Sequence, residues 1–456
     1  MGMSDVIAAI SSGLVQSGIG IVRVSGDEAA AVCDKVVSLK GMRLRDAEPN
    51  RFHYAHITEG GRILDEAMVV FLKAPHSYTA ENTVEIQCHG GPYLMKQVLG
   101  AVLRAGARPA EPGEFTKRAF LNGRLDLSQA EAVMSLIRSE NEFAREMAMR
   151  QLRGGVSAVL QEIRRKLLHR AAGIEAALDD PEHYTPEEMT EGLEAELTGW
   201  LVQLKDMADT FDNGKMIAEG IPTAIIGRPN VGKSSLLNAL LGEDRAIVTD
   251  TPGTTRDTLE ERLRLGPMTL LISDTAGIRE TQDKIEQIGV DRAEKKARES
   301  DLLLLVTDGS RPLTKEDRAL LESTKEKKRL ILVNKCDLPP AKGTDWQKSA
   351  GKNPVIHISA RTGQGLSKLR EAIETLYDYG EITQKPLVVT SLRHKLLLEE
   401  AQASLREAQK SMAAGIPEDL ITIDLMAAYR SLGLILGEET SDDLIDAVFR
   451  DFCMGK

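Results

Sequence analysis

Residues 227–234 of this chain read Gly227-Arg228-Pro229-Asn230-Val231-Gly232-Lys233-Ser234. This stretch matches the pattern G-x-x-x-x-G-K-S, follows an apolar run at 223–227 and precedes a helical pattern, as a phosphate-binding loop does. Glycines in such a loop let backbone N–H groups turn toward phosphates, and the N-terminus of the next helix favours an anion. Lys233 is expected to contact the β- and γ-phosphates, and the hydroxyl of Ser234 to bind Mg²⁺. The sequence therefore predicts a nucleoside triphosphate site.

Two later segments complete the expected phosphate and magnesium site. Asp274-Thr275-Ala276-Gly277 ends a predicted strand at 269–273, so Asp274 can act in the magnesium shell and the Gly277 N–H can meet the γ-phosphate. Gly253-Thr254-Thr255-Arg256-Asp257 lies between this segment and the P-loop, which makes Thr255 a second Mg²⁺ ligand. The order of these segments predicts a switch protein that hydrolyses its nucleotide.

Two further strand ends indicate which base is bound. In Asn334-Lys335-Cys336-Asp337, the Asp337 carboxylate can accept hydrogen bonds from N1–H and the exocyclic amine of guanine. Adenine has an acceptor at N1 and no such amine, so the carboxylate would be left unpaired. A backbone N–H of Ser359-Ala360 can reach guanine O6. The sequence therefore predicts GTP as the substrate.

The candidate nucleotide-binding residues come from these five segments and their immediate surroundings. They are Asn230, Val231, Gly232, Lys233, Ser234, Ser235, Thr249, Thr254, Thr255, Asp274, Thr275, Ala276, Gly277, Asn334, Lys335, Asp337, Ser359 and Ala360.

Hydrolysis needs a group that orients water, and the usual one is missing. The segment Asp274-Thr275-Ala276-Gly277 corresponds to switch II of small GTPases. Many of those proteins have Gln directly after its glycine, where this chain has Ile278. Another side chain must place the water. Arg256 and Arg279 either supply charge as arginine fingers or are exposed switch arginines, and the sequence leaves both readings open.

The remaining pattern predicts several domains. Short apolar strands alternate with helical stretches from 223 to 359, which is typical of a parallel sheet with crossover helices. The flanks are helical, and strands are expected near the N-terminus at 19–24, 67–72 and 83–88, with a helix after Gly91-Pro92. Ser128 with Glu131 resembles a capping box that opens one of the flanking helices. We expect a multidomain α/β and α+β protein whose P-loop G domain, with a Ras-like parallel sheet, is inserted in a helical domain. The expected boundaries are 1–118 for the α+β domain, 119–216 and 380–456 for the two helical parts, and 217–379 for the G domain.

The composition limits which binding partners, cysteine sites and cellular compartment we expect. The 456 residues carry a net charge of −11, so general attraction to nucleic acid is not expected. A basic run (Arg164, Arg165, Lys166, His169 and Arg170) is either a local RNA-binding face or the solvated face of a helix. The four cysteines, Cys33, Cys88, Cys336 and Cys453, are too scattered for a zinc site or a disulfide framework. Without an apolar run long enough to span a bilayer or a charged signal segment, we expect a cytoplasmic protein.

Several long motifs outside the G domain resemble one known family. They are Gly20-Ile21-Val22-Arg23-Val24-Ser25-Gly26, the run from Glu111 to Asn122 (EPGEFTKRAFLN), Leu125-Asp126-Leu127 with Gln129-Ala130-Glu131-Ala132, and the final Phe452-Cys453-Met454-Gly455-Lys456. Nearly end to end, the chain resembles the MnmE (TrmE) family of bacterial tRNA-modification GTPases. It departs from the family pattern at Gly13-Leu14-Val15-Gln16-Ser17, which replaces a Pro-Gly-x-Gly stretch.

The resemblance implies ligands beyond GTP and Mg²⁺. The N-terminal domain would bind a tetrahydrofolate derivative, in the 5-formyl or 5,10-methylene form, through Arg23, Glu85, Arg124 and Lys456, and would form a homodimer. The family often has Lys where this chain has Arg124. The GTPase would be activated by K⁺ held by Asn230, Thr249, Thr251 and Thr254, and Glu286 would orient the water, making Glu286 and Lys233 the candidate catalytic residues.

The resemblance also implies the reaction. With the FAD-containing partner MnmG, in a heterotetramer-type complex, the family places aminomethyl or carboxymethylaminomethyl groups on C5 of the tRNA wobble uridine. Two other classes carry the same G-domain motifs. A ribosome-assembly switch would normally add a basic RNA module, and a membrane-remodelling GTPase would need a basic amphipathic helix; the sequence indicates neither.

Overall fold

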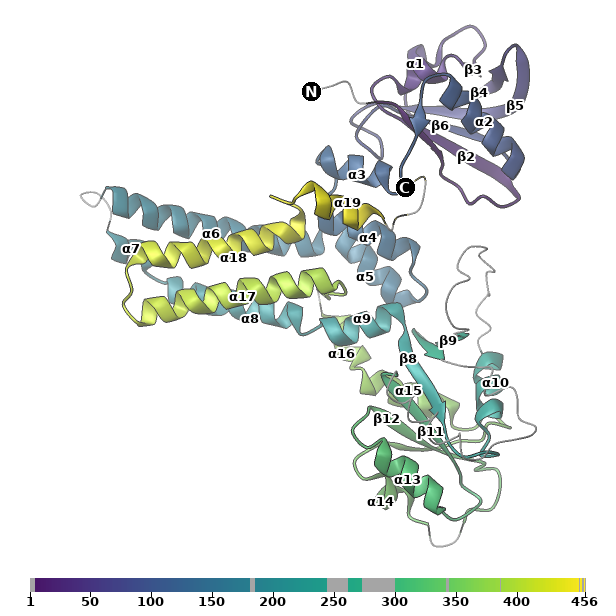
Figure 1. The fold of residues 1–456 in the computed structure, drawn as a ribbon, viewed down its shortest axis with the longest axis vertical. Coiled ribbons are helices and arrows are strands. Elements are labelled where there is room, and N and C mark those ends of the chain that lie inside the picture. Colours follow the sequence, from purple (N-terminus) through teal and green to yellow (C-terminus); the bar gives the residue numbers. More distant parts are fainter. Residues whose placement is uncertain are drawn as a thin grey trace. The chain divides into compact units, whose positions relative to one another are not determined.

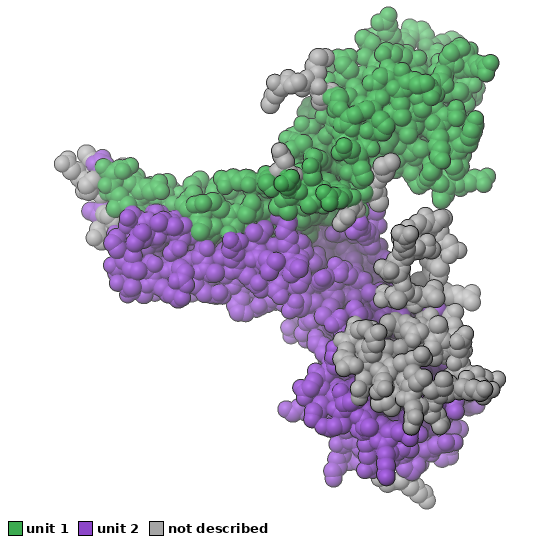
Figure 2. All heavy atoms as spheres, viewed as in Figure 1, with its two compact units in different colours: residues 1–134, 151–179, 425–456 green, residues 135–150, 180–424 purple. Residues whose placement is uncertain are grey.

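The computed structural model describes residues 5–180, 185–243, 261–272, 300–341, 344–385 and 387–450, together with Phe452 and Gly455. The chain separates into two compact units, coloured in Figure 2. The first unit contains residues 1–134, 151–179 and 425–456, and the second contains 135–150 and 180–424. The expected boundaries at 118, 216 and 379 stay predictions.

The first unit begins with a seven-stranded sheet in the order β3-β4-β5-β6-β2-β1-β7 (Figure 1). All neighbouring strands are antiparallel except β1 and β7. The strands are β1 (Ile7–Ile10), β2 (Ser17–Ser25), β3 (Val37–Ser38), β4 (Phe52–Glu59), β5 (Arg62–Leu72), β6 (Thr83–Gly90) and β7 (Arg108–Pro109). The expected strands at 19–24, 67–72 and 83–88 are confirmed within β2, β5 and β6. The sequence reading missed the other four.

Two helices, α1 (Ala29–Cys33) and α2 (Pro92–Arg104), supply the apolar cover of this sheet. A 3-10 turn, η1 (Leu44–Asp46), adds Leu44. Helix α2 begins at Pro92, as the Gly91-Pro92 signal predicts, since proline suits the first helical turn. Val98 and Val102 are fully buried against alternate strand residues such as Val22 and Ile86. This alternation of buried residues along each strand makes one face of the sheet the core.

The helical part of this unit contains α3 (Glu114–Leu121), α4 (Leu127–Ile137), α6 (Gly155–Asp179) and α19 (Asp442–Arg450). The expected capping box at Ser128 and Glu131 is wrong. Helix α4 begins at Leu127, and the reciprocal bonds join Asp126 and Gln129, two residues before the expected pair: Gln129 N donates to Asp126 Oδ1 over 2.8 Å, and Asp126 N donates to Gln129 Oε1 over 3.0 Å. An aspartate accepts hydrogen bonds from the first backbone N–H groups of a helix as well as a serine does. Asp126 and Ser128 were therefore both possible N-caps for this helix.

The basic run on α6 does not form one basic face. Arg164 is buried and forms an ion pair with Glu438, whereas Arg165 and Lys166 both pair with Glu162 on their own helix. Arg164 therefore belongs to the packing of α6 against the end of α18 (Glu418–Leu436), where it also donates to the carbonyl oxygen of Tyr429.

The second unit contains helices on both sides of the G domain in sequence. They are α5 (Glu142–Leu152), α7 (Pro186–Thr190), α8 (Leu193–Ala208), α9 (Phe211–Glu219) and α17 (Leu392–Ala413). Helices α8 and α17 lie side by side, and Gln409 Nε2 donates to Thr198 Oγ1 over 2.9 Å. Helix α9 leads into the first G-domain strand and packs on it, so the helical layer and the sheet share Ile217 in their core.

The G domain is a six-stranded sheet in the order β13-β12-β11-β8-β10-β9. Its strands are β8 (Ile221–Ile226), β9 (Glu261–Leu265), β10 (Met268–Ile272), β11 (Leu302–Asp308), β12 (Arg329–Asn334) and β13 (Val355–His357). Neighbouring strands are parallel except β9 and β10. The helices described are α10 (Lys233–Glu243), α13 (Lys315–Ser323), α14 (Trp346–Ala350), α15 (Leu366–Leu376) and α16 (Tyr379–Gln384).

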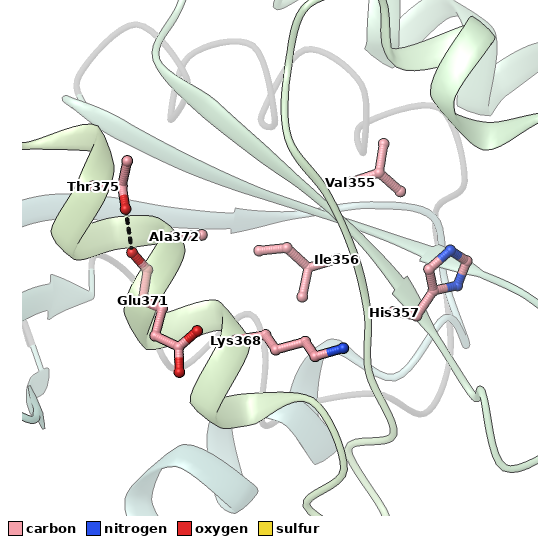
Figure 3. A pocket seen from close by; sticks show the side chains of 7 residues that line it. All are labelled: Val355, Ile356, His357, Lys368, Glu371, Ala372 and Thr375. Carbon is pink, nitrogen blue, oxygen red and sulfur yellow. Dashed lines mark hydrogen bonds between the residues drawn. The ribbon is translucent and has the colours of Figure 1, made fainter.

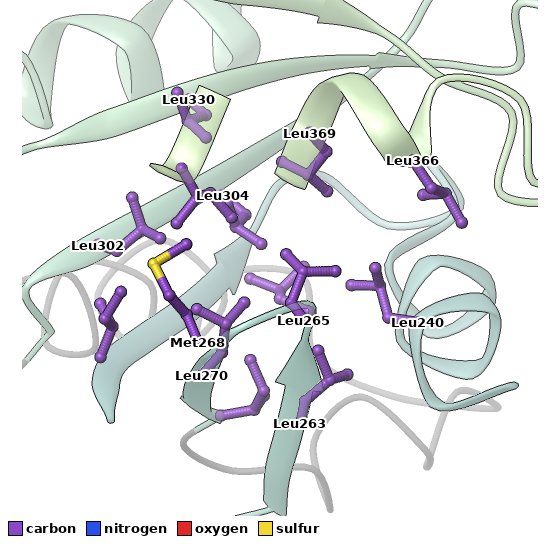
Figure 4. Close-up of a cluster of buried hydrophobic side chains, with 14 of the residues drawn as sticks. Leu240, Leu263, Leu265, Met268, Leu270, Leu302, Leu304, Leu330, Leu366 and Leu369 are labelled. Carbon is purple, nitrogen blue, oxygen red and sulfur yellow. The ribbon is translucent and has the colours of Figure 1, made fainter. Parts of the chain in front are cut away.

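Strand β11 shows why this sheet is buried on both faces. Leu302 and Leu304 point into the cluster that includes α10 and α15 (Figure 4), whereas Leu303 and Leu305 pack with residues of α13. A parallel sheet covered by helices on both sides has such continuous apolar strands. The predicted parallel sheet is confirmed. The antiparallel β9 was missed, although its alternating Glu-Arg-Leu-Arg-Leu pattern is that of a half-buried strand.

Candidate functional site

The P-loop joins β8 to α10 with a backbone that only certain residues can adopt. Gly227 and Gly232 have φ of +150° and +100°, and Asn230 has φ of +64°. A Cβ at Gly227 would lie 2.3 Å from the carbonyl oxygen of Val306, so the loop passes directly over the end of β11. Glycine suits both positions, because it adopts a positive φ without strain and its lack of a Cβ permits the close approach at Gly227.

Lys233 is the first residue of α10, and its ammonium group binds back to the beginning of the P-loop. Its Nζ donates to the carbonyl oxygens of Gly227 and Arg228 over 2.8 and 2.7 Å. Ser234 is half-buried and Ser235 exposed in the first turn of the same helix. Two of the residues expected at the phosphates and Mg²⁺, Lys233 and Ser234, thus lie together at one helix N-terminus, which favours an anion.

The loop at 334–337, here called the base loop, is fastened to the P-loop by Asn334. Its Nδ2 donates to the carbonyl oxygen of Val231 over 2.8 Å, and its Oδ1 accepts from the backbone N–H of Ala360 over 2.9 Å. Three expected nucleotide-binding segments thus meet at one buried side chain.

Asp337 lies at the other end of the base loop with its carboxylate held from two sides. Ser359 Oγ donates to Oδ1 over 2.7 Å, and Arg361 Nη2 lies 3.0 Å from Oδ2. The Ser359 hydrogen bond, with help from Arg361, holds the pKa of the Asp337 carboxyl below its usual range. The group is therefore ionised at neutral pH, which is the state that accepts hydrogen bonds from two N–H donors.

Lys335 links the same two loops through a contact that sequence reasoning missed. Its Nζ donates to the carbonyl oxygen of Asn230 over 3.0 Å and to Asp308 Oδ2 over 2.6 Å. Asp308 ends β11, directly beside Asn334 in the sheet register. A carboxylate at the carboxyl end of a buried parallel strand is the signal that would have found it.

A second carboxylate holds the P-loop from the side of α13. Arg228 Nε donates to Asp317 Oδ1 over 2.8 Å, and Asp317 also caps α13 together with Thr314. Because Asp317 is buried, this ion pair fixes the side chain at the second position of the P-loop motif.

The other expected residues of the nucleotide and metal sites lie outside the described part of the chain. They are Thr249, Thr251, Thr254, Thr255, Asp274, Thr275, Ala276, Gly277 and Glu286. Lys456, expected at the folate site, lies outside it as well.

Three of the expected folate residues gather in the first unit around a side chain that sequence reasoning missed, Tyr78. Arg23 and Glu85 are paired across β2 and β6, with Nε and Oε1 2.9 Å apart. The guanidinium carbons of Arg23 and Arg124 lie 5.3 and 5.0 Å from the centre of the Tyr78 ring. Arg23 Nη1 also donates to the carbonyl oxygen of Gly455 over 3.4 Å, which brings the C-terminal motif to this cluster. Tyr78 lies in a loop without a sequence pattern of its own.

A hollow of about 400 Å³ lies elsewhere in the G domain, between β13 and α15 (Figure 3). Its lining includes His357, Lys368 and Glu371. None of the expected nucleotide-binding residues that the structure describes lines it, so it is separate from the described part of the P-loop site.

Comparison with known proteins agrees with this arrangement. A family model described as the N-terminus of the GTP-binding protein TrmE matches residues 6–124, and one described as the MnmE helical domain matches 127–453. The tRNA modification GTPase MnmE of Lachnoclostridium phytofermentans is 46% identical over 456 residues, covering 99% of this chain and 100% of the relative. The protein of the same name from Geobacillus kaustophilus is 45% identical over 458 residues and covers 99% of both chains.

The chain belongs to the MnmE family of tRNA modification GTPases. Among solved structures, the G domain of the T. maritima FeoB iron transporter matches 34% of the chain and 98% of its own length, with 30% identity and a TM-score of 0.26. Membership confirms the family resemblance, the expected fold class and the enzyme class, a GTPase acting in tRNA modification.

Two further observations describe this MnmE family member. Among the helices described, none is long and apolar enough to cross a membrane. No group of three or more His, Cys, Asp or Glu side chains in the described ranges is arranged to hold a metal ion. The expected Mg²⁺ and K⁺ ligands are instead mainly hydroxyl and amide oxygens.

Proposed function

We propose that this chain is a K⁺-activated GTPase that, with a FAD-containing MnmG partner, installs aminomethyl or carboxymethylaminomethyl groups at C5 of the tRNA wobble uridine. The observation that supports it most is the union of the P-loop and the base loop through Asn334, with the ionised Asp337 at its far end. That arrangement suits a guanine nucleotide, because the carboxylate matches the two donors on the guanine edge.

The residues present fit Mg²⁺ and K⁺. The hydroxyls of Ser234 and Thr255 would hold Mg²⁺, which prefers oxygen ligands. K⁺ would be held by Asn230, Thr249, Thr251 and Thr254. The backbone of Asn230 is left-handed, and its carbonyl oxygen accepts a hydrogen bond from Lys335, which holds this residue in place. When bound, the two ions supply positive charge beside the phosphates. Lys233 would bind the same phosphates, and Glu286 would orient the attacking water.

The cluster around Tyr78 fits a tetrahydrofolate derivative, either 5-formyl or 5,10-methylene. Two guanidinium groups beside one aromatic ring suit a ligand that has both flat rings and carboxylates. Next to Gly455, Ser11 Oγ is buried and has no hydrogen-bond partner among the described residues, so its hydroxyl could bind a ligand. Arg23, Glu85, Arg124 and Lys456 would hold the folate, which supplies the one-carbon unit when bound.

The proposed assembly is a homodimer that joins MnmG in a heterotetramer-type complex on tRNA in the cytoplasm. We also propose the domain limits expected from the sequence, 1–118 for folate binding and dimerisation, 217–379 for the G domain, and 119–216 with 380–456 for the helical domain. Support comes from family membership over the whole chain.

Mass spectrometry of tRNA nucleosides from cells that lack the protein tests the reaction. We expect the C5 aminomethyl-type groups to disappear, to return with the wild-type chain, and to stay absent with Lys233→Ala. Lys325→Ala, which removes an exposed lysine of the G domain, is the control and should restore them. Unchanged nucleosides in the deletion strain would overturn the proposal and favour a ribosome-assembly switch.

Measurements of GTP turnover test the proposed activation by K⁺ and the proposed role of Glu286 in orienting the attacking water. We expect faster turnover in KCl than in NaCl at equal ionic strength, and a large loss of turnover with unchanged GTP binding in Glu286→Ala. Equal rates in both salts would rule out activation by K⁺.

Calorimetry with 5-formyltetrahydrofolate tests whether the cluster around Tyr78 in the first unit binds folate. Arg23→Ala should abolish heat of binding, because it removes the partner of Glu85 and one neighbour of Tyr78. Arg104→Ala, which removes an exposed arginine paired with Glu59, should bind as the wild type does. Wild-type binding by Arg23→Ala would exclude this cluster.

A further inference from the structure

Asp308 is a buried carboxylate with both oxygens engaged. Its side chain is 5% exposed at the end of β11. Oδ1 accepts from the backbone N–H and the hydroxyl of Ser310 over 3.0 and 2.6 Å, and Oδ2 accepts from Lys335 Nζ over 2.6 Å. The Ser310 bonds fix the plane of the carboxylate, so Oδ2 points steadily at the ammonium group.

The ammonium group of Lys335 passes this restraint to the P-loop. Besides Asp308, it donates to the carbonyl oxygen of Asn230 over 3.0 Å. Asn230 and Lys335 have φ of +64° and +66°, a region that residues other than glycine occupy at a cost. The surrounding contacts must therefore hold both residues in place, and the contact through Lys335 Nζ joins them directly.

We propose that Asp308 is a positioning residue of the nucleotide site. By holding Lys335, it fixes the main chain at Asn230 and keeps the P-loop and the base loop in the geometry that binds the nucleotide before the nucleotide arrives. The inference rests on the proposed guanine-nucleotide site and adds a residue that lies outside its expected motifs.

The charge of Asp308, and not only its shape, is required for this role. Among the described residues, Lys335 Nζ has one charged acceptor, Asp308, and one neutral acceptor, the Asn230 carbonyl. Hydrogen bonds between charged partners are roughly twice as strong as neutral ones. Burial alone raises the pKa of the Asp308 carboxyl, but the bonds from Lys335 and Ser310 outweigh burial and leave this pKa below its ordinary value. The carboxylate is thus ionised at neutral pH.

The test compares Asp308→Asn with the wild type in the full-length chain. Binding of a fluorescent GDP analogue should weaken about tenfold, as loss of one charge-assisted hydrogen bond predicts. KM for GTP should rise by a similar factor while kcat changes less than about twofold, because loop geometry before binding is affected. Glu322→Gln, which removes the charge of a residue on α13 that forms an exposed ion pair with Lys325, is the control and should bind as the wild type does.

A double-mutant cycle separates positioning from general damage. Lys335→Met should itself weaken GDP binding, and adding Asp308→Asn to it should weaken binding less than about twofold further, because the partner is already gone. A full tenfold additional loss would show that Asp308 acts by another route and would overturn the proposal.

A milder variant covers the case in which Asp308→Asn does not fold. Ser310→Ala keeps the carboxylate but removes its 2.6 Å hydroxyl bond, and should weaken GDP binding about threefold. Wild-type affinity in every variant that folds would overturn the role of Asp308. Failure of the wild-type chain to bind GDP would instead overturn the proposed guanine-nucleotide site.

Discussion

The side-chain amide of Asn334 donates a hydrogen bond from Nδ2 to the carbonyl oxygen of Val231, with the two atoms 2.8 Å apart. This bond holds the P-loop against the end of β12 and leaves no room above the next residue. A Cβ built on Gly232 would lie 2.2 Å from the same Nδ2 atom. The second glycine of the motif is therefore required by a neighbouring side chain as well as by its φ of +100°.

Gly232→Ala should weaken both the fold and nucleotide binding. The methyl group must displace Asn334, and alanine must adopt a left-handed backbone, which costs on the order of 1–3 kcal/mol. We expect the free energy of unfolding of the G domain to fall by roughly 2 kcal/mol, together with loss of GDP binding. Urea denaturation and a fluorescent GDP analogue measure the two effects.

Gly242→Ala is the matched control, because Gly242 lies in α10 and, apart from its own helix, no atom of the described residues lies within 4 Å of its hypothetical Cβ. Alanine should leave GDP binding unchanged and raise stability by up to about 1 kcal/mol, since glycine is a poor helix former. Equal losses in the two variants would show that close contact with Asn334 is not the cause.

Asp337→Asn should change which base is accepted. The amide presents both a donor and an acceptor where the carboxylate presents two acceptors, so it no longer matches both guanine donors. We expect GTP turnover to fall and turnover of xanthosine triphosphate to rise, measured by phosphate release at equal nucleotide concentrations. Unchanged preference for GTP would contradict the assignment of Asp337.

The motifs and the apolar pattern were sufficient for the five parallel strands of the G-domain sheet and for the phosphate loop, because both depend on local sequence. The run 302–307 is apolar at every position but the last, and it became the doubly covered β11. Asp308 and Tyr78 escaped notice because their importance arises from residues distant in sequence: Lys335 for one, Arg23 and Arg124 for the other. The capping error at Ser128 has a different cause, since Asp126 offered an equally good cap two residues earlier.

Acid should destabilise the first unit through Glu114. Burial alone raises the pKa of this carboxyl, but hydrogen bonds from Arg108, the Glu111 N–H and Arg118 outweigh burial and hold the pKa below its ordinary value. Because the folded-state pKa is lowered, the stabilisation is complete above the unfolded-state pKa of about 4.3 and is lost as pH falls through the folded value.

Glu114→Gln should therefore be less stable than the wild type by roughly 2 kcal/mol at pH 7, and this difference should shrink below about pH 4. Thermal unfolding followed between pH 3 and pH 7 measures it. Glu48→Gln, at an exposed pair with Arg51, should track the wild type throughout. A difference between Glu114→Gln and wild type that stayed constant with pH would exclude the ionised carboxylate as its source.

Two adjacent arginines on α6 should differ in how much their replacement by methionine lowers stability. The side chain of Arg164 is 7% exposed, pairs with Glu438 and lies 4.1 Å from the centre of the Tyr429 ring, whereas that of Arg165 is 68% exposed and contacts Glu162 one turn away. Arg164→Met keeps the apolar stem but leaves Glu438 without its partner and the Tyr429 carbonyl without its donor.

We expect Arg164→Met to lower the free energy of unfolding by roughly 2 kcal/mol, less than for a fully buried pair because Glu438 remains half-exposed. Arg165→Met should unfold at the wild-type denaturant concentration, since exposed ion pairs add little. Urea titrations of both variants measure the contrast. If tRNA binding by Arg165→Met were also unchanged in a gel-shift assay, this part of α6 would be a solvated helix face; weaker binding would restore the RNA-binding reading for its exposed residues.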